Sequence, residues 1–507
     1  MGSKSEMDPE GITESNIRRH VGSLEQKLLK NQKDRIEYPD DPERWIKSEV
    51  DLEEQIRLFQ DLSTIPELYA PFEEHGGFRI LCEALSHPNI DIAIATINVL
   101  NDVVDPETIV GLRNARRILE AVQSLDIHEL CITILLKIDE ENSEVDYDGV
   151  KSCLGLLESL LELFPKAVED AGANVELLQF LLKRMKSSKT LEYDNNRVHA
   201  GEILCILLQQ SEECLRLVGG PTVDGIDKLL RIVTVYRKKD PEGVEEEELA
   251  ENAFQCLCSL MFIEANRVAF GKLQGIKLLI RLIKERRPIY GLAIKLLDYA
   301  LMDCASNCNM FVEGMGLKYI YSVLMRKGVK TKTGTEAEKE EDEHILGVIH
   351  SLCSNCTGTS IARVLNKFVE HKYEKLERLV ELHEKYTAIS NKAAKKKENK
   401  SSSAKSMYSA LKLNEDTEQY LDMYEAGLSI CQLVDTILLR LYNMGNSTLS
   451  TCLLVLLHNK GVDMQDIYNN ISDYMEHMDE SAEENKKNIH RFLTNFLTGA
   501  SDSGLFK

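Results

Sequence analysis

The stretch Gly275-Ile276-Lys277-Leu278-Leu279 is one of a family of similar segments that decide the fold of this chain. Each joins a glycine turn to an amphipathic helix, which we expect to begin about two residues after the glycine. The last four glycines lie 53, 50 and 41 residues apart. A helical period of about 40–47 residues is typical of armadillo and HEAT repeats, which stack into solenoids. The copies begin at Gly76-Gly77, Gly172, Gly225, Gly275 and Gly316, and a degenerate copy without glycine begins at Leu125.

A second, more apolar helix follows in each unit, and we expect it to line the concave face of the array. After the first copy, Pro88 breaks the chain, and apolar residues then recur at three- and four-residue spacing from Ile90 to Val103. Equivalent inner helices are predicted near 148–163, 196–209, 248–262, 289–302 and 344–355. The sequence therefore predicts an all-α, armadillo/HEAT-like right-handed superhelical solenoid with helical N- and C-terminal caps.

The organisation along the chain follows from these repeats and from the polar segments between them. We predict that the chain comprises a disordered tail (1–15), a helical cap (16–63), the repeat array (64–386), a Lys/Ser-rich flexible linker (387–408) and a C-terminal helical region (409–507). The polar segments 238–248 and 328–343 are interpreted as loops. Within the linker, Lys395-Lys396-Lys397 is either a nuclear localisation signal or a solvated lysine run.

The amino-acid composition limits the kinds of molecule that the protein is expected to bind. The 507 residues carry 83 acidic and 61 basic side chains, a net charge of −22. Such a chain repels a nucleic-acid backbone and attracts basic peptides, although the same charge also keeps a long helical surface in solution. The 13 cysteines lie in apolar helical runs, which is typical of core thiols in a reducing compartment. No apolar segment has the length of a signal peptide or membrane span, so we expect a soluble intracellular protein.

Motifs for catalysis, cofactors and metals are missing. Gly219-Gly220-Pro221-Thr222 lacks the Lys-Ser/Thr of a phosphate loop, and neither G-x-S-x-G nor H-E-x-x-H occurs. The closely spaced cysteines, such as Cys353 and Cys356, are interpreted as core residues rather than zinc ligands. The 12 histidines form no clustered pattern, and His371 and His383 are expected to be solvated. We therefore predict no catalytic residue, no cofactor and no metal site.

Polar residues of the inner helices are the candidate binding groups. Peptide-binding armadillo proteins hold their ligand with an asparagine on each inner helix and a tryptophan one turn earlier, but this chain has its only tryptophan, Trp45, before the array. A basic peptide would therefore be held by charge rather than by an aromatic ladder. The alternative is that these side chains are ordinary polar residues of a solvated face. The predicted groove residues are Asp102, Glu158, Glu202, Ser259 and Asp298.

Several long strings resemble the beta-catenin-like protein 1 family. They include the segment from Lys30 to Pro42 (KNQKDRIEYPDDP), Leu177–Lys186 (LLQFLLKRMK), Ala293–Ala300 (AIKLLDYA) and Leu365–Tyr386 (LNKFVEHKYEKLERLVELHEKY). The resemblance runs from about residue 24 to residue 500 with the same order and spacing. Family members usually carry a longer N-terminal extension with a basic localisation signal, whereas only about twenty polar residues precede the first helix here.

The resemblance implies a non-enzymatic armadillo protein of the nucleus that acts in pre-mRNA splicing through the NineTeen complex. It also implies recognition of basic, nuclear-localisation-like segments, as in a Myb-like splicing factor, and self-association as a homodimer. No direct contact with nucleic acid or membrane is expected. Two other classes of protein fit the sequence less well. A nuclear transport receptor-like cargo adaptor would need the missing tryptophan ladder and a basic autoinhibitory segment, and an enzyme would need a motif that the chain lacks.

Overall fold

A computed structural model describes residues 11–140, 143–186, 194–328, 332–398, 415–479 and 482–506. Every regular element in these ranges is a helix, as the sequence predicts. None of the helices searched there has both the length and the apolar character needed to cross a bilayer. The chain divides into two compact units: residues 1–233 with 241–260 form unit 1, and residues 234–240 with 261–507 form unit 2. Most of the predicted tail, residues 1–10, lies outside the described residues.

Unit 1 begins with two cap helices, α1 (Ile17–Glu37) and α2 (Pro42–Arg57), which pack against each other on either side of the predicted proline turn. Two short 3₁₀ helices, η1 (Leu58–Thr64) and η2 (Pro66–Leu68), lead into the repeats. The remaining helices of unit 1 are α3 (Tyr69–Glu74), α4 (Gly77–Leu85), α5 (Ile90–Val103), α6 (Pro106–Val110), α7 (Ala115–Gln123), α8 (Ile127–Leu135), α9 (Glu144–Leu163), α10 (Pro165–Ala173), α11 (Val175–Arg184), α12 (Asn195–Gln210), α13 (Glu212–Gly219), α14 (Gly225–Thr234) and α15 (Val244–Leu260).

Unit 2 begins with three-helix repeats like those of unit 1, and its C-terminal part is built differently. The 3₁₀ helix η3 (Val235–Arg237) precedes two further repeats, and longer helices follow. The helices of unit 2 are α16 (Glu264–Lys272), α17 (Gly275–Glu285), α18 (Tyr290–Leu301), α19 (Ala305–Glu313), α20 (Gly316–Leu324), α21 (Glu336–Asn355), α22 (Gly358–Glu398), α23 (Glu415–Met423), the π-helical turn η5 (Tyr424–Leu428), α24 (Ser429–Asn443), α25 (Ser447–Lys460), α26 (Met464–Glu476) and α27 (Glu483–Asp502).

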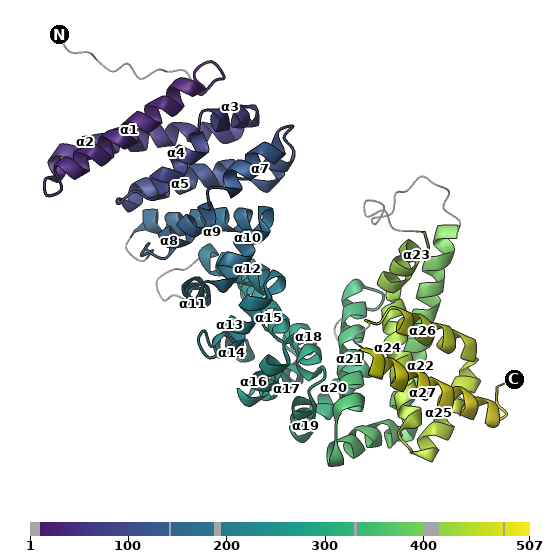
Figure 1. Ribbon diagram of the computed structural model, residues 1–507. Coiled ribbons are helices and arrows are strands. Elements are labelled where there is room, and N and C mark those ends of the chain that lie inside the picture. The colour runs from purple at the N-terminus through teal and green to yellow at the C-terminus, as the bar shows by residue number, and fades with distance from the viewer. Residues whose placement is uncertain are drawn as a thin grey trace, which may run out of the picture. The chain divides into compact units, whose positions relative to one another are not determined.

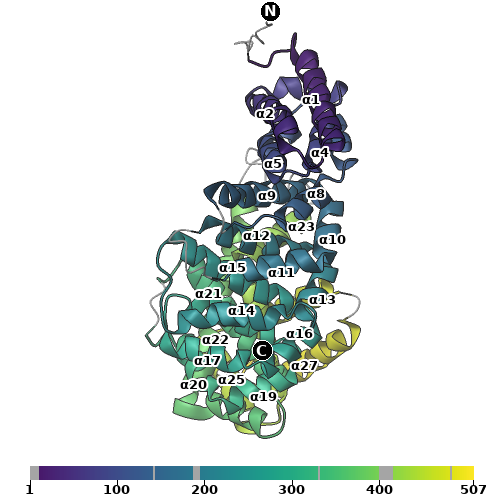
Figure 2. The ribbon, with the colours of Figure 1, turned by 90° about the vertical axis from the view of Figure 1, so that its left-hand side faces the viewer.

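The inner helix of each repeat is its third helix, and these third helices stack side by side within each unit. In unit 1, α5 packs on α9, α9 on α12 and α12 on α15, and Figures 1 and 2 show the four helices in this order. In unit 2, α18 packs on α21 and α21 on α24. The predicted inner helices are confirmed, and their exposed sides form a polar face that we call the ladder face of each unit.

The recurring glycines have a different role from the one that the sequence suggested. Four of the helices begin at the glycine itself, not two residues later, and the left-handed backbone belongs to the residue before it, such as Gln274 (φ 67°). A Cβ atom added to Gly275 would lie 2.4 Å from the ring of Phe270, and Gly316 faces Phe311 in the same way. These positions require glycine because an aromatic ring from the preceding helix fills the space of a side chain. Gly172 differs, since it lies within α10.

Three predicted irregular segments are partly helical, and in the first of them, the predicted loop 238–248, residues 244–248 begin α15. Residues 387–398 of the predicted linker continue α22, because Ala393, Ala394 and the flanking lysines have high helix propensity and Ser390 is buried. The rest of that linker, residues 399–408, lies outside the described residues. Residues 336–343 of the predicted loop form the start of α21, where the Thr335 hydroxyl accepts a hydrogen bond from the backbone N–H of Glu338 (3.3 Å).

Candidate functional site

The ladder face of unit 1 is built from residues that recur one repeat apart. Close packing of the third helices depends on small residues, since a Cβ atom on Gly155 of α9 would lie 2.6 Å from the side-chain oxygen of Asn101 of α5. Gly201 of α12 lies similarly against Asn252 of α15. Because the helices approach so closely, polar side chains of neighbouring repeats are brought together.

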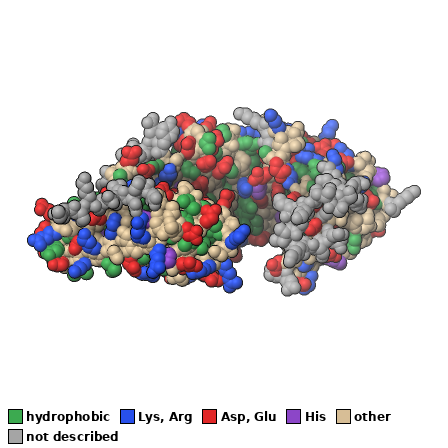
Figure 3. Space-filling model, turned by 90° about the horizontal axis from the view of Figure 1, so that it is seen from above, with side chains coloured by type: hydrophobic (Ala, Val, Ile, Leu, Met, Phe, Trp, Pro, Cys, Tyr) green, Lys and Arg blue, Asp and Glu red, His purple; other side chains and the backbone are tan. Residues whose placement is uncertain are grey.

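Figure 3, a view from above, shows acidic and basic side chains interspersed, so the negative charge is not spread evenly over this face of the molecule.

Three carboxylates, Glu158 of α9, Glu202 of α12 and Glu248 of α15, form what we call the carboxylate row. Burial raises the pKa of Glu202, and the negative charges of Glu158 and Glu248 raise it further, against the opposite effect of His199. Side-chain atoms of Glu158, His199 and Glu202 lie within 4.8 Å of one another, and Glu248 lies on α15, which packs on α12. The row therefore concentrates negative charge where three successive repeats meet.

One histidine partly compensates the carboxylate row. The Nε2 atom of His199 lies 2.7 Å from a carboxylate oxygen of Glu158, and this hydrogen bond lowers the pKa of Glu158. No described ion pair or hydrogen bond engages the side chains of Glu202 and Glu248. The row thus retains acceptor capacity for a cationic ligand.

Asp102 lies on α5 at the other end of the unit 1 ladder face. Its side chain is exposed, and partial burial raises its pKa. Within the described ranges no hydrogen bond or ion pair of the Asp102 carboxylate is found. Its role in binding a ligand stays a prediction.

Ser259, in contrast, is only 2% exposed and does not reach the ladder face. It lies near the C-terminal end of α15, where Cys256, Leu257 and Leu260 are also buried. Polar positions of α15 that are exposed or half-buried lie earlier in the helix and include Glu248, Glu251 and Asn252. The predicted contribution of Ser259 to an exposed groove is therefore wrong.

Asp298 lies on the ladder face of unit 2, but it is held by its neighbours. Burial raises the pKa of Asp298, and its carboxylate lies 3.0 Å from Nδ1 of His344 on α21. Tyr299 follows it, with its ring 5.5 Å from that of Phe262, which is 62% exposed. The Tyr299 ring also lies 6.1 Å from the ring of His344, the hydrogen-bond partner of Asp298.

Histidine–carboxylate pairs across neighbouring repeats were missed from the sequence. His128 faces Asp170, His199 faces Glu158 and His344 faces Asp298, each between 41 and 46 residues apart. That spacing equals one repeat, so a search for histidines one period from an acid would have found these pairs. The expectation that His383 is solvated is also wrong, because it is buried on α22 and bonds Asp435 of α24 (2.6 Å).

The group formed by His383, Cys431 and Asp435 has the donor atoms of a metal site but the hydrogen bonds of a structural cluster. Burial alone would lower the pKa of His383, yet the adjacent Asp435 carboxylate raises it to about 11. A protonated imidazole has no lone pair left for a metal. The Asn470 amide also donates to Asp435 (2.9 Å), which completes the cluster. These residues hold α22, α24 and α26 together.

A second acidic set, Glu338, Glu341 and Asp342, lies in the first turns of α21, and we call it the α21 cluster. All three side chains are buried. A guanidinium nitrogen of Arg326 lies 2.8 Å from Glu341, and the Lys385 ammonium lies 3.2 Å from Glu338 and 3.0 Å from Asp342. Each acid of this cluster therefore has a cationic partner within the protein.

The cysteines behave as core residues, as predicted. Eleven are buried, and burial raises the pKa of Cys214 and of Cys353 to about 12 each. A thiol with so high a pKa carries almost no thiolate at neutral pH and is a poor nucleophile.

Comparison with known proteins places these features in a family. The family model described as catenin-beta-like, Arm-motif containing nuclear, matches residues 2–472. Beta-catenin-like protein 1 of Rattus norvegicus is 32% identical over 96% of this chain and 86% of its own length, and the Homo sapiens protein is 31% identical over the same shares. The Schizosaccharomyces pombe homologue is 32% identical over 75% of this chain and 66% of its own length. The chain belongs to this catenin-beta-like armadillo family, whose repeats form a scaffold.

Proposed function

We propose that the protein is a nuclear scaffold of pre-mRNA splicing that binds basic segments of partner proteins on the ladder face of unit 1. The observation that carries this proposal is the carboxylate row, in which Glu158, Glu202 and Glu248 lie close together with one histidine as the only described partner. A lysine- or arginine-rich segment would neutralise these carboxylates and relieve their mutual repulsion. The family description as nuclear and the scaffold fold support the same setting.

The kind of ligand follows from the form of the surface. Asp102 on α5 and the carboxylate row on α9, α12 and α15 lie on successive stacked helices, which suits an extended peptide with several cations. A disordered segment would lose conformational entropy on binding, so we expect affinity in the roughly micromolar range and a strong salt dependence. A nuclear-localisation-like segment of a Myb-like splicing factor has this composition.

Calorimetry with such a segment at two salt concentrations tests the proposal. The neutral triple variant Glu158→Gln, Glu202→Gln, Glu248→Gln should weaken binding by at least about tenfold, since three neighbouring carboxylates lose their charge. A control variant, Glu107→Gln, Glu169→Gln, Glu176→Gln, removes the same charge from α6, α10 and α11 and should bind within about twofold of the parent chain, because distant surface charges are screened. Equal weakening in both variants would show a general charge effect and contradict the site.

A further inference from the structure

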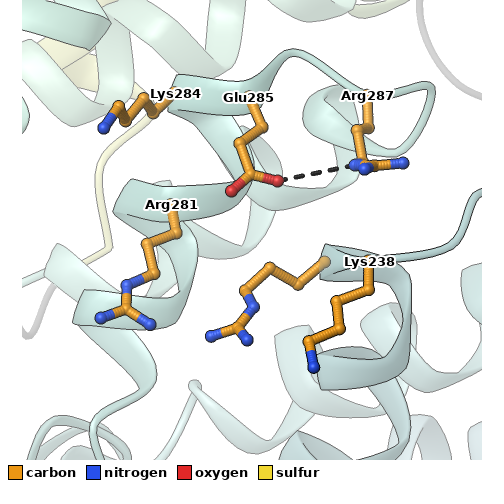
Figure 4. A pocket seen from close by; sticks show the side chains of 6 residues that line it. Lys238, Arg281, Lys284, Glu285 and Arg287 are labelled. Atoms are coloured by element: carbon orange, nitrogen blue, oxygen red, sulfur yellow. Dashed lines mark ion pairs between the residues drawn. The ribbon is translucent and has the colours of Figure 1, made fainter.

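Unit 2 carries a concentration of positive charge that contrasts with the chain's net charge of −22. It surrounds an open hollow of about 840 Å³ between η3 and the end of α17 (Figure 4). We call this feature the basic hollow. Its lining residues are Arg237, Lys238, Arg281, Lys284, Glu285 and Arg287.

Rigid backbone segments hold the basic hollow in shape. On one side, Tyr236 is only 2% exposed and fixes η3, which carries Arg237. On the other side, Arg281 and Lys284 lie on the exposed face of α17, opposite its buried apolar side chains. The helix ends at Glu285, and the left-handed backbone of Arg286 (φ 50°) turns the chain so that the next residue, Arg287, joins the lining. The hollow is therefore part of the folded repeat.

The charges of the basic hollow are poorly balanced. Arg287 has two acidic neighbours, Asp240 at 3.0 Å and Glu285 at 3.5 Å, and Figure 4 shows the Glu285 carboxylate directed toward it. For the side chains of the other four cations, the described residues provide neither an ion pair nor a hydrogen bond; these cations are Arg237, Lys238, Arg281 and Lys284. Five positive charges thus face two negative ones.

Several exposed arginines elsewhere on the molecule lie against carboxylates, as Arg79 does with Glu25 (3.0 Å) and Arg231 with Asp227 (2.6 Å). In a chain with an excess of acids, a group of five cations that faces two described carboxylates is not the expected result of a random surface. Like charges that lie together repel one another, and a bound anion removes that repulsion.

We propose that the basic hollow binds a phosphorylated segment of a partner protein. A phosphoserine or phosphothreonine carries nearly two negative charges and three acceptor oxygens, which match the planar fork of an arginine such as Arg281 or Arg237. The hollow is short, and the rest of the chain repels a long polyanion. A compact phosphate group on a peptide therefore fits better than a nucleic-acid backbone. The site is independent of the ladder face, because it takes a ligand of the opposite charge.

Fluorescence anisotropy with the full chain tests this assignment. The probe is a short fluorescein-labelled Gly/Ser peptide with two phosphoserines, and the same peptide without phosphate and an oligouridine of similar length are compared with it. The double variant Arg281→Glu, Lys284→Glu should weaken binding of the phosphopeptide at least about tenfold, because two cations are replaced by repelling anions. Both side chains are exposed, so the fold should survive, which circular dichroism checks.

The matched control is Lys272→Glu, Lys277→Glu, which makes the same change of charge at exposed positions in α16 and α17 outside the hollow. We expect this variant to bind the phosphopeptide within about threefold of the parent chain, a change that reflects screened long-range charge. Equal loss in both variants, or no binding of the phosphopeptide by the parent chain, would overturn the proposal. Tighter binding of oligouridine than of the phosphopeptide would also overturn it, by assigning the hollow to nucleic acid.

Discussion

The carboxylate row of unit 1 and the α21 cluster of unit 2 each bring three acids together, and their surroundings differ. In the α21 cluster the acids are buried, and Arg326 and Lys385 supply cations within 4 Å. In the carboxylate row the acids are half-buried or exposed, and only Glu158 has a described partner. Acidic side chains alone therefore do not identify a binding surface. The row remains available to a ligand because the fold does not neutralise it.

The largest predicted effect comes from removing the cation of the α21 cluster. Arg326→Met keeps most of the side-chain stem but leaves Glu341 and Glu338 buried without that partner. We expect the free energy of unfolding to fall by about 3 kcal/mol, the usual consequence of leaving a buried charge unpaired. Urea denaturation followed by circular dichroism measures the change.

Lys327→Met is the matched control for Arg326. Lys327 is the next residue, its side chain is 60% exposed, and its nearest acid is Glu374 at 3.5 Å. Its replacement should change stability by less than about 1 kcal/mol, as for other exposed ion pairs. If both variants lost the same stability, the α21 cluster would not be the source.

Replacement of one acid in each set should have effects of opposite sign. Glu338→Gln removes a buried charge with cationic neighbours and should lower the free energy of unfolding by roughly 1–2 kcal/mol. Glu202→Gln removes a charge that its neighbours Glu158 and Glu248 repel, so it should leave stability unchanged or slightly higher at pH 7. A clear loss of stability in Glu202→Gln would show that the row supports the fold instead.

The acids of the two sets should also differ in how their charge makes stability depend on pH, and this effect is smaller than those of the substitutions above. Burial would raise the pKa of Glu338, but the backbone N–H of Gly334 and the Lys385 ammonium hold it below its ordinary value. Its stabilising contribution is therefore present above the unfolded pKa of about 4.3 and is lost as pH falls through the lower folded value.

Glu202 should respond in the opposite direction, because its folded pKa is raised. Its ionised form opposes folding at neutral pH, and protonation removes that effect as pH falls through the folded pKa toward about 4.3. Any stability gain of Glu202→Gln should consequently vanish on acidification, while the loss in Glu338→Gln should persist to lower pH. Urea denaturation from pH 7 to pH 4 checks both trends, and a gain that grew on acidification would contradict the account.

The repeat period and the inner helices could be predicted because they depend on local pattern. Apolar spacing located α5, α9, α12, α15 and α18 to within a few residues. The role of Gly275 could not be predicted in the same way, since it depends on where the Phe270 ring lies in three dimensions. The start of α21 was missed although its signal is local: Thr335 followed three residues later by Glu338 is a capping box.

The candidate site was predicted in part, for physical reasons that differ between residues. Asp102 is exposed and Glu158 and Glu202 are half-buried on the third helices, where the apolar pattern placed them. Ser259 is not exposed, because it lies among the buried residues Cys256, Leu257 and Leu260 near the C-terminal end of α15. The pairing of Asp298 with His344, and the neutralisation of the α21 cluster, depend on contacts across neighbouring helices that no local pattern records.

The central claim is that a basic peptide binds the carboxylate row and not the α21 cluster. The most direct test is photo-crosslinking of the full chain with a lysine/arginine-rich segment of a Myb-like splicing factor that carries a benzophenone group, followed by mass spectrometric mapping. We predict crosslinks to α9, α12 and α15, which an excess of unlabelled peptide removes. Crosslinks confined to α21 and α22, or to the first and second helices of the repeats, would contradict the account.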